Sequence, residues 1–158
     1  MNIVLAIFCR GSDRAFTYPW FIRGFTRSRW AHVCVSDGEV VLNPTREGIR
    51  YFSLAEFDHH NAEWFTFVTP RNPDLKGIGE RLHDWRLSPI RTSLHYLTRG
   101  FFPSLDCVTI TASALRAAGL AVPDGIVSPE DLYEWAKFVA PFSARSSAFH
   151  VGGDCQTV

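Results

Sequence analysis

The chain has 158 residues, a length that suits one domain with a single core, and it is too rich in hydrophobic (46%) and aromatic (14%) residues for a disordered protein. Its 16 basic and 16 acidic residues leave a formal net charge of zero. This balance argues against nucleic acid as the main partner, because phosphate binding needs a basic surplus or a basic patch.

The first eight residues form an apolar run with no charged leader, and the run is too short to span a membrane. We therefore expect a buried first strand at Ile3–Phe8, no signal peptide, no transmembrane segment and synthesis in the cytoplasm. A protein of this kind would leave the cell by lysis or inside an assembled particle.

Four further β-rich runs follow. Two of them flank Ser36-Asp37-Gly38, and Asp-Gly between such runs is a strong hairpin signal. Before the hairpin, apolar residues at helical spacing predict a helix at Tyr18–Phe25, with Pro19 tolerated near its start. The predicted strands after the first are Ala31–Val35, Glu39–Asn43, Ile49–Phe52 and Glu63–Thr69.

Helices dominate the second half. Apolar stripes predict helices over Leu75–Trp85 and over Val108–Ala118, and Ser128-Pro129-Glu130-Asp131 is a capped start for a third. The sequence thus predicts an α+β domain over residues 1–142, with a meander-like antiparallel sheet and packed helices. We expect residues 143–158 to be a loose or docked tail.

Cys107 stands where a loop gives way to a helix, and Asp106 before it can cap that helix. The positive end of the helix dipole favours a thiolate, which is the nucleophilic form of cysteine. The alternative for Cys107 is a small core residue in an amphipathic helix. The four cysteines show neither CxxC nor metal-type spacing, so we expect reduced thiols and no metal or other cofactor.

His32 lies on a predicted strand and is the proposed general base, with His95, just before the Cys107 loop, as a weaker alternative. A two-residue turn at Asp37-Gly38 would place Asn43 directly opposite His32, on the same face of the hairpin. The Asn43 carbonyl could then accept a hydrogen bond from the imidazole and hold the ring, as in a Cys-His-Asn arrangement.

Several segments recur in this order within one known superfamily. They are Phe25-Thr26-Arg27-Ser28-Arg29-Trp30-Ala31-His32-Val33, Gly38 with Val40-Val41-Leu42-Asn43, Glu47-Gly48-Ile49-Arg50 with Leu54, Asp106-Cys107, and Ser128-Pro129-Glu130-Asp131-Leu132-Tyr133. Together they resemble the circularly permuted NlpC-type, papain-like cysteine peptidases, a group that includes the lecithin retinol acyltransferase-like proteins.

The resemblance implies a papain-like (permuted NlpC-type) fold in which Cys107 is the nucleophile, His32 the base and Asn43 the orienting residue. Many relatives carry histidine at the third place and a tyrosine just before the nucleophile. Here Asn43 replaces the former, and no tyrosine lies among the five residues before Cys107. The backbone N–H of Cys107 is then the default oxyanion donor.

The resemblance further implies a cysteine hydrolase, an amidase or endopeptidase acting on peptidoglycan stem peptides. A compact single domain without a wall-binding module or signal suits a phage-borne enzyme carried in a tail or baseplate of the virion. Two alternatives stay open. One is a lipid or thioester acyltransferase or esterase with the same Cys-His chemistry. The other is a non-catalytic structural component of an assembly such as a phage tail.

Overall fold

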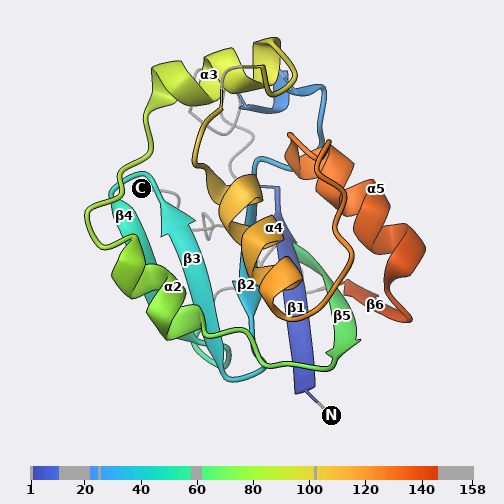
Figure 1. Ribbon diagram of the computed structural model, residues 1–158. Coiled ribbons are helices and arrows are strands. Elements are labelled where there is room, and N and C mark those ends of the chain that lie inside the picture. The colour runs from blue at the N-terminus through green and yellow to red at the C-terminus, as the bar shows by residue number, and fades with distance from the viewer. Residues whose placement is uncertain (1, 11–21, 25, 58–61, 102, 146–158) are drawn as a thin grey trace.

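The computed structural model describes residues 2–10, 22–24, 26–57, 62–101 and 103–145. Within this part of the chain, six strands form one antiparallel sheet in the order β4-β3-β2-β1-β5-β6 (Figure 1). The strands are β1 (Asn2–Cys9), β2 (His32–Ser36), β3 (Val40–Thr45), β4 (Gly48–Ser53), β5 (Ala62–Thr69) and β6 (Phe142–Arg145).

Three helices cover one face of this sheet, and a fourth lies beyond its end (Figure 1). The covering helices are α2 (Leu75–Arg81), α4 (Cys107–Ala117) and α5 (Pro129–Val139), and α3 (Pro89–Leu97) lies beyond the sheet end where β1 finishes and β2 begins. The main apolar core fills the space between the sheet and helices α2, α4 and α5. No helix among the described residues is long and apolar enough to cross a membrane.

Local sequence explains where α4 and α5 begin. The Asp106 side chain accepts from the backbone N–H of Thr109, while the Thr109 hydroxyl contacts the Asp106 backbone N–H, which is a reciprocal capping box. Ser128 and Asp131 make the same box at α5, with Pro129 at the first helical position. The predicted caps at Asp106 and Ser128 are therefore confirmed.

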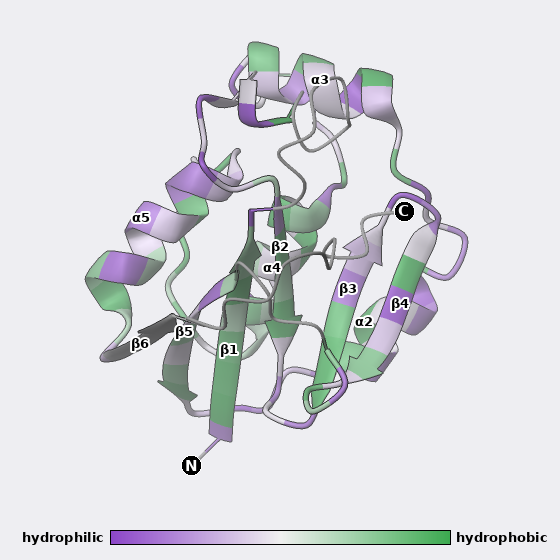
Figure 2. Ribbon diagram, turned by 180° about the vertical axis from the view of Figure 1, so that it is seen from behind, coloured by the Kyte–Doolittle hydropathy of each residue, from purple (hydrophilic) through white to green (hydrophobic). Residues whose placement is uncertain are grey.

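The other face of the sheet carries a second, smaller apolar cluster (Figure 2). Because strand residues alternate between faces, β1 and β2 contribute to both clusters, and β2 is buried throughout while β1 is buried from Ala6 to Cys9. The buried members of the second cluster are Ile7, Cys9, Cys34, Val41, Phe57 and Ala62.

The predicted α+β class, the antiparallel sheet and the packed helix headed by Cys107 agree with this structure. The helix α3 was not predicted, although Ser88-Pro89 is the same kind of capped start, with proline in the first turn, that predicted α5. Residues 143–145, which we expected in the tail, complete β6 and pair with β5. Most of the predicted helix at Tyr18–Phe25 lies outside the described residues, although 22–24 are helical.

Candidate active site

His32 and Asn43 form a buried hydrogen-bonded pair at one end of the sheet. The ring atom Nε2 of His32 lies 2.6 Å from Oδ1 of Asn43, and the two residues are 7% and 4% exposed. Because a carbonyl oxygen only accepts, Nε2 carries the hydrogen, and the basic atom of the neutral ring is Nδ1. The predicted contact between imidazole and amide is therefore present, with the amide holding the ring in one tautomer.

The hairpin reaches this contact through a different register from the one we predicted. Ser36 pairs with Val41, so four residues rather than two connect the paired strands, and Asn43 is diagonal to His32 instead of directly opposite. The Asp37 carboxylate stabilises the longer loop by accepting from two backbone N–H groups. A shift of two residues keeps every side chain on its face, so the His32–Asn43 contact survives.

The cross-strand register also decides which face the pair occupies. His32 is the partner of Cys9 in β1, and Cys9 belongs with Cys34 and Val41 to the second cluster. Directly paired residues share a face, so the imidazole lies on the face opposite to the one covered by α4. Val33 and Val35, the intervening residues of β2, face α4 instead.

Cys107 begins α4 and is 4% exposed, within the main core. One turn further on, the Thr111 hydroxyl lies 3.5 Å from the carbonyl oxygen of Val33, which sets the level of α4 along β2. Cys107 and His32 therefore lie at the same end of the sheet, on different faces. Among the described residues, no hydrogen bond joins the Cys107 thiol to the His32 ring.

The head of α4 holds a second buried polar group. The Asp106 carboxyl is fully buried, and burial raises its pKa above the usual value. Four neighbouring groups lower the pKa but do not outweigh burial. In decreasing order they are the backbone N–H of Thr109, the His95 imidazole, the Thr109 hydroxyl and the Tyr96 hydroxyl. A raised pKa weakens the negative charge that Asp106 would present to a thiolate on Cys107.

Two features of the site were not predicted. Cys9 is the thiol directly cross-strand from His32, and no sequence pattern predicts that two strands so far apart in the chain pair with each other. His95, expected near the Cys107 loop as a weaker alternative base, lies beside Asp106, but the helix α3 that carries it there was not predicted. Among the described residues, no group of three or more His, Cys, Asp or Glu side chains could hold a metal ion.

Comparison of the chain with protein-family models, with curated proteins and with solved structures gave no match. The resemblance to the papain-like superfamily therefore rests on the sequence of this chain alone.

Proposed function

We propose that the protein is a papain-like cysteine hydrolase that cleaves an amide bond, with Cys107 as nucleophile, His32 as general base and Asn43 as the residue that orients the base. The observation that supports this best is the 2.6 Å contact between Nε2 of His32 and Oδ1 of Asn43. With the hydrogen on Nε2, the basic position of a neutral ring is Nδ1, which is the tautomer of a Cys-His-Asn arrangement.

In the proposed reaction, Nδ1 of His32 takes the proton of the Cys107 thiol, and the thiolate attacks the substrate carbonyl. The carbon–nitrogen bond breaks, the leaving amine takes the proton from the imidazolium, and a thioester remains. Water then attacks the thioester with His32 as base, which releases the acid and restores the thiol. The helix dipole of α4 and the N–H of Cys107 would stabilise the developing negative charge.

This reaction requires the thiol and the imidazole to meet at the end of the sheet where α4 and β2 begin. Thr111 and Val33 place both groups at that end of the sheet, but on different faces, so the reaction also requires the imidazole and the thiol to meet around the strand end. A substrate in the peptide stems of bacterial peptidoglycan follows from the family resemblance alone.

A cysteine-mapping experiment tests the assignment. The folded protein is treated with substoichiometric iodoacetamide, and the labelled cysteine is identified by mass spectrometry. We expect Cys107 to react first and His32→Ala to slow its labelling, because the imidazole favours the thiolate. Equal labelling of Cys107 in wild type and His32→Ala would contradict the pairing, and preferential labelling of Cys9 would transfer the nucleophile to the other face.

Turnover of peptidoglycan fragments tests the activity itself. We expect Cys107→Ala to abolish release of free amines, while Cys34→Ala, a matched removal of a buried thiol, retains it. Undiminished turnover in Cys107→Ala would end the nucleophile assignment.

Two further candidates are each favoured by a specific observation. A lipid or thioester acyltransferase or esterase is favoured by the exposed apolar side chains on and after α3, namely Ile90, Leu94, Leu97 and Phe101. A non-catalytic component of an assembly is favoured by the burial of Cys107 on the opposite face from His32. Profiling of muropeptides against phospholipids separates the first from the proposed amidase, and failure of any cysteine to react in the folded state supports the second.

A further inference from the structure

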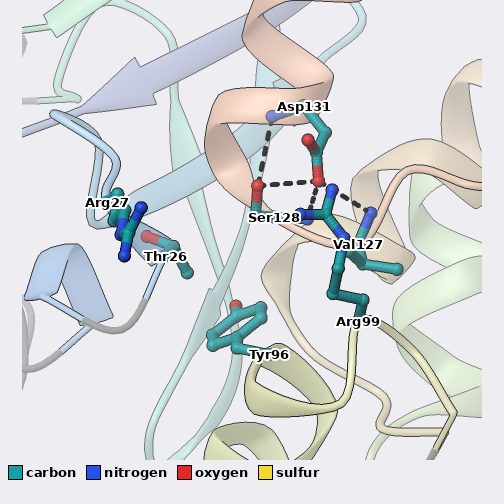
Figure 3. Close-up of a pocket in the computed structure, with 7 residues that line it drawn as sticks. All are labelled: Thr26, Arg27, Tyr96, Arg99, Val127, Ser128 and Asp131. Atoms are coloured by element: carbon teal, nitrogen blue, oxygen red, sulfur yellow. Dashed lines mark hydrogen bonds between the residues drawn. The ribbon is translucent and has the colours of Figure 1, made fainter.

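A small polar pocket lies at the same end of the molecule as α3, between three segments that are distant in the sequence (Figure 3). Its volume is about 190 Å³, which suits one chemical group rather than a whole drug-sized ligand. Its walls come from the segment before β2, from the end of α3 and from the start of α5. The side chains that matter here are Arg27, Tyr96, Arg99, Ser128 and Asp131.

The segment that carries Arg27 is attached to α5. The Ser28 hydroxyl donates to the Glu130 carboxylate at 2.9 Å, and the backbone N–H of Arg29 donates to the same oxygen at 3.2 Å. These bonds are made by the two residues that follow Arg27, and they fix the backbone from which its side chain reaches the pocket. The Glu130 carboxylate therefore holds the segment before β2 against α5 and does not pair with Arg27.

Arg99 is fixed in a similar way on the other side. Gly100 adopts a φ of +90°, and a β-carbon there would lie only 2.7 Å from the Val127 side chain. Only glycine allows this close approach, which brings Arg99 against the segment leading into α5. In Figure 3 the two arginines stand on different sides of the pocket, with the Tyr96 hydroxyl between them.

Neither guanidinium has an ion-pair partner among the residues that the structure describes. Elsewhere on the surface, Arg50 pairs with Glu47 and Arg116 with Asp124. The one carboxylate in the pocket wall, Asp131, is engaged in the α5 cap: its Oδ2 accepts from the backbone N–H groups of residues 127 and 128 and from the Ser128 hydroxyl. Two positive groups therefore face the pocket against one carboxylate that already has three donors.

The backbone of both arginines is strained as well. Arg27 and Arg99 have φ of +52° and +49°, and they are the only non-glycine residues in the described part of the chain with positive φ. Arg99 directly follows the C-cap of α3, where a left-handed residue commonly ends a helix. The two residues with this backbone conformation line the same pocket.

We propose that this pocket binds an oxyanion, the carboxylate or phosphate group of a small molecule, held between the guanidinium groups of Arg27 and Arg99. Guanidinium groups present paired donors that match both oxyanions. Tyr96, which lines the pocket, also lowers the pKa of Asp106, the residue before Cys107. If the proposed function holds, the bound group is the acidic group of the substrate, but the binding itself does not depend on catalysis.

Isothermal titration of the full chain with sodium phosphate and, separately, with N-acetylglutamate tests the pocket at constant ionic strength. We expect saturable binding of one anion per chain, weakened at least tenfold in Arg27→Gln and in Arg99→Gln. Arg46→Gln is the matched control: Arg46 is exposed, lies in the turn between β3 and β4, and should bind as wild type does. Preference for one probe identifies the oxyanion as phosphate or carboxylate.

The proposal is wrong if no saturable binding occurs with either probe, or if all three arginine variants lose the same affinity, since that would report only net charge. Arg99→Asn guards against a folding artefact, because asparagine tolerates positive φ. We expect this variant to melt at or above the wild-type temperature and still lose binding. Binding that persists in Cys107→Ala, together with no turnover in wild type, would retain the pocket and refute the hydrolase.

Discussion

The His32–Asn43 pair and the Asp106 carboxyl are buried at the same end of the molecule, but different interactions compensate for the loss of water around them. On β2 and β3, His32 and Asn43 satisfy one another as a neutral donor and acceptor. At the head of α4, Asp106 buries a carboxyl whose pKa is raised by loss of water, despite the helix cap and the nearby His95. Burial of the first pair is therefore offset by the hydrogen bond within it, whereas burial of the Asp106 carboxyl favours its protonated form.

The groups also differ in their surroundings. The His32–Asn43 pair shares its sheet face with the thiols of Cys9 and Cys34, while Asp106 and Cys107 lie with the helices. A papain-like reaction would use an imidazole from the first group and a thiol from the second. Changes that affect one group and not the other therefore show whether the two work together.

The largest effect is expected for His32→Ala. Loss of a general base lowers kcat/KM by about 10²–10⁴-fold, because the thiol then depends on water for deprotonation. The measurement is hydrolysis of peptidoglycan fragments as a function of pH, since loss of the base should also remove the rise of activity that follows imidazole deprotonation. Activity equal to that of wild type would show that the two groups do not cooperate.

Asn43→Ala should act on stability first. It leaves the buried Nε2–H of His32 without its acceptor, which costs about 1–3 kcal/mol of unfolding free energy. Asn43→Asp retains an acceptor oxygen and serves as the matched variant, with a pKa of His32 higher than in wild type because a carboxylate favours the imidazolium. Urea unfolding and NMR titration of the His32 ring measure the two effects. An unchanged unfolding midpoint in Asn43→Ala would mean that the hydrogen bond is replaced at no cost.

The sequence predicted local features of both groups well. The caps at Asp106 and Ser128 depend on residues three positions apart, and the shared face of His32 and Asn43 depends only on the parity of their separation. What could not be predicted depends on pairing over long distances. The partnership of Cys9 with His32 joins strands 23 residues apart, and it decides which sheet face the imidazole occupies. The predicted hairpin register was wrong because the Asp37 carboxylate stabilises a four-residue loop in place of the two-residue Asp-Gly turn.

Two substitutions of Asp106 distinguish its role as a helix cap from the effect of its charge. Asp106→Ala removes the cap of α4 and should cost about 0.5–2 kcal/mol, whereas Asp106→Asn keeps an acceptor for the Thr109 N–H. Because the folded pKa of Asp106 is raised, its carboxyl adds stability at pH values below the pKa of the unfolded chain, and this contribution is lost as pH rises through the folded value. Wild type should thus lose stability relative to Asp106→Asn as pH rises from acid to neutral. A difference between the two proteins that is independent of pH would contradict the raised pKa.

The smallest effect is expected for Thr109, the other half of the same capping box. Its hydroxyl accepts from the Asp106 backbone N–H at 2.8 Å and also approaches the Asp106 side chain. Thr109→Val removes both contacts at nearly constant volume and should cost about 0.5–1.5 kcal/mol, the net contribution of a typical hydrogen bond, while Thr109→Ser should cost less. If Asp106 acts on Cys107 through its protonation state, Thr109→Val should also raise the Asp106 pKa further, because the hydroxyl lowers it in wild type. The pH profile of Cys107 alkylation measures this coupling, and a profile that moves equally in Thr109→Ser would show that the hydroxyl is not its source.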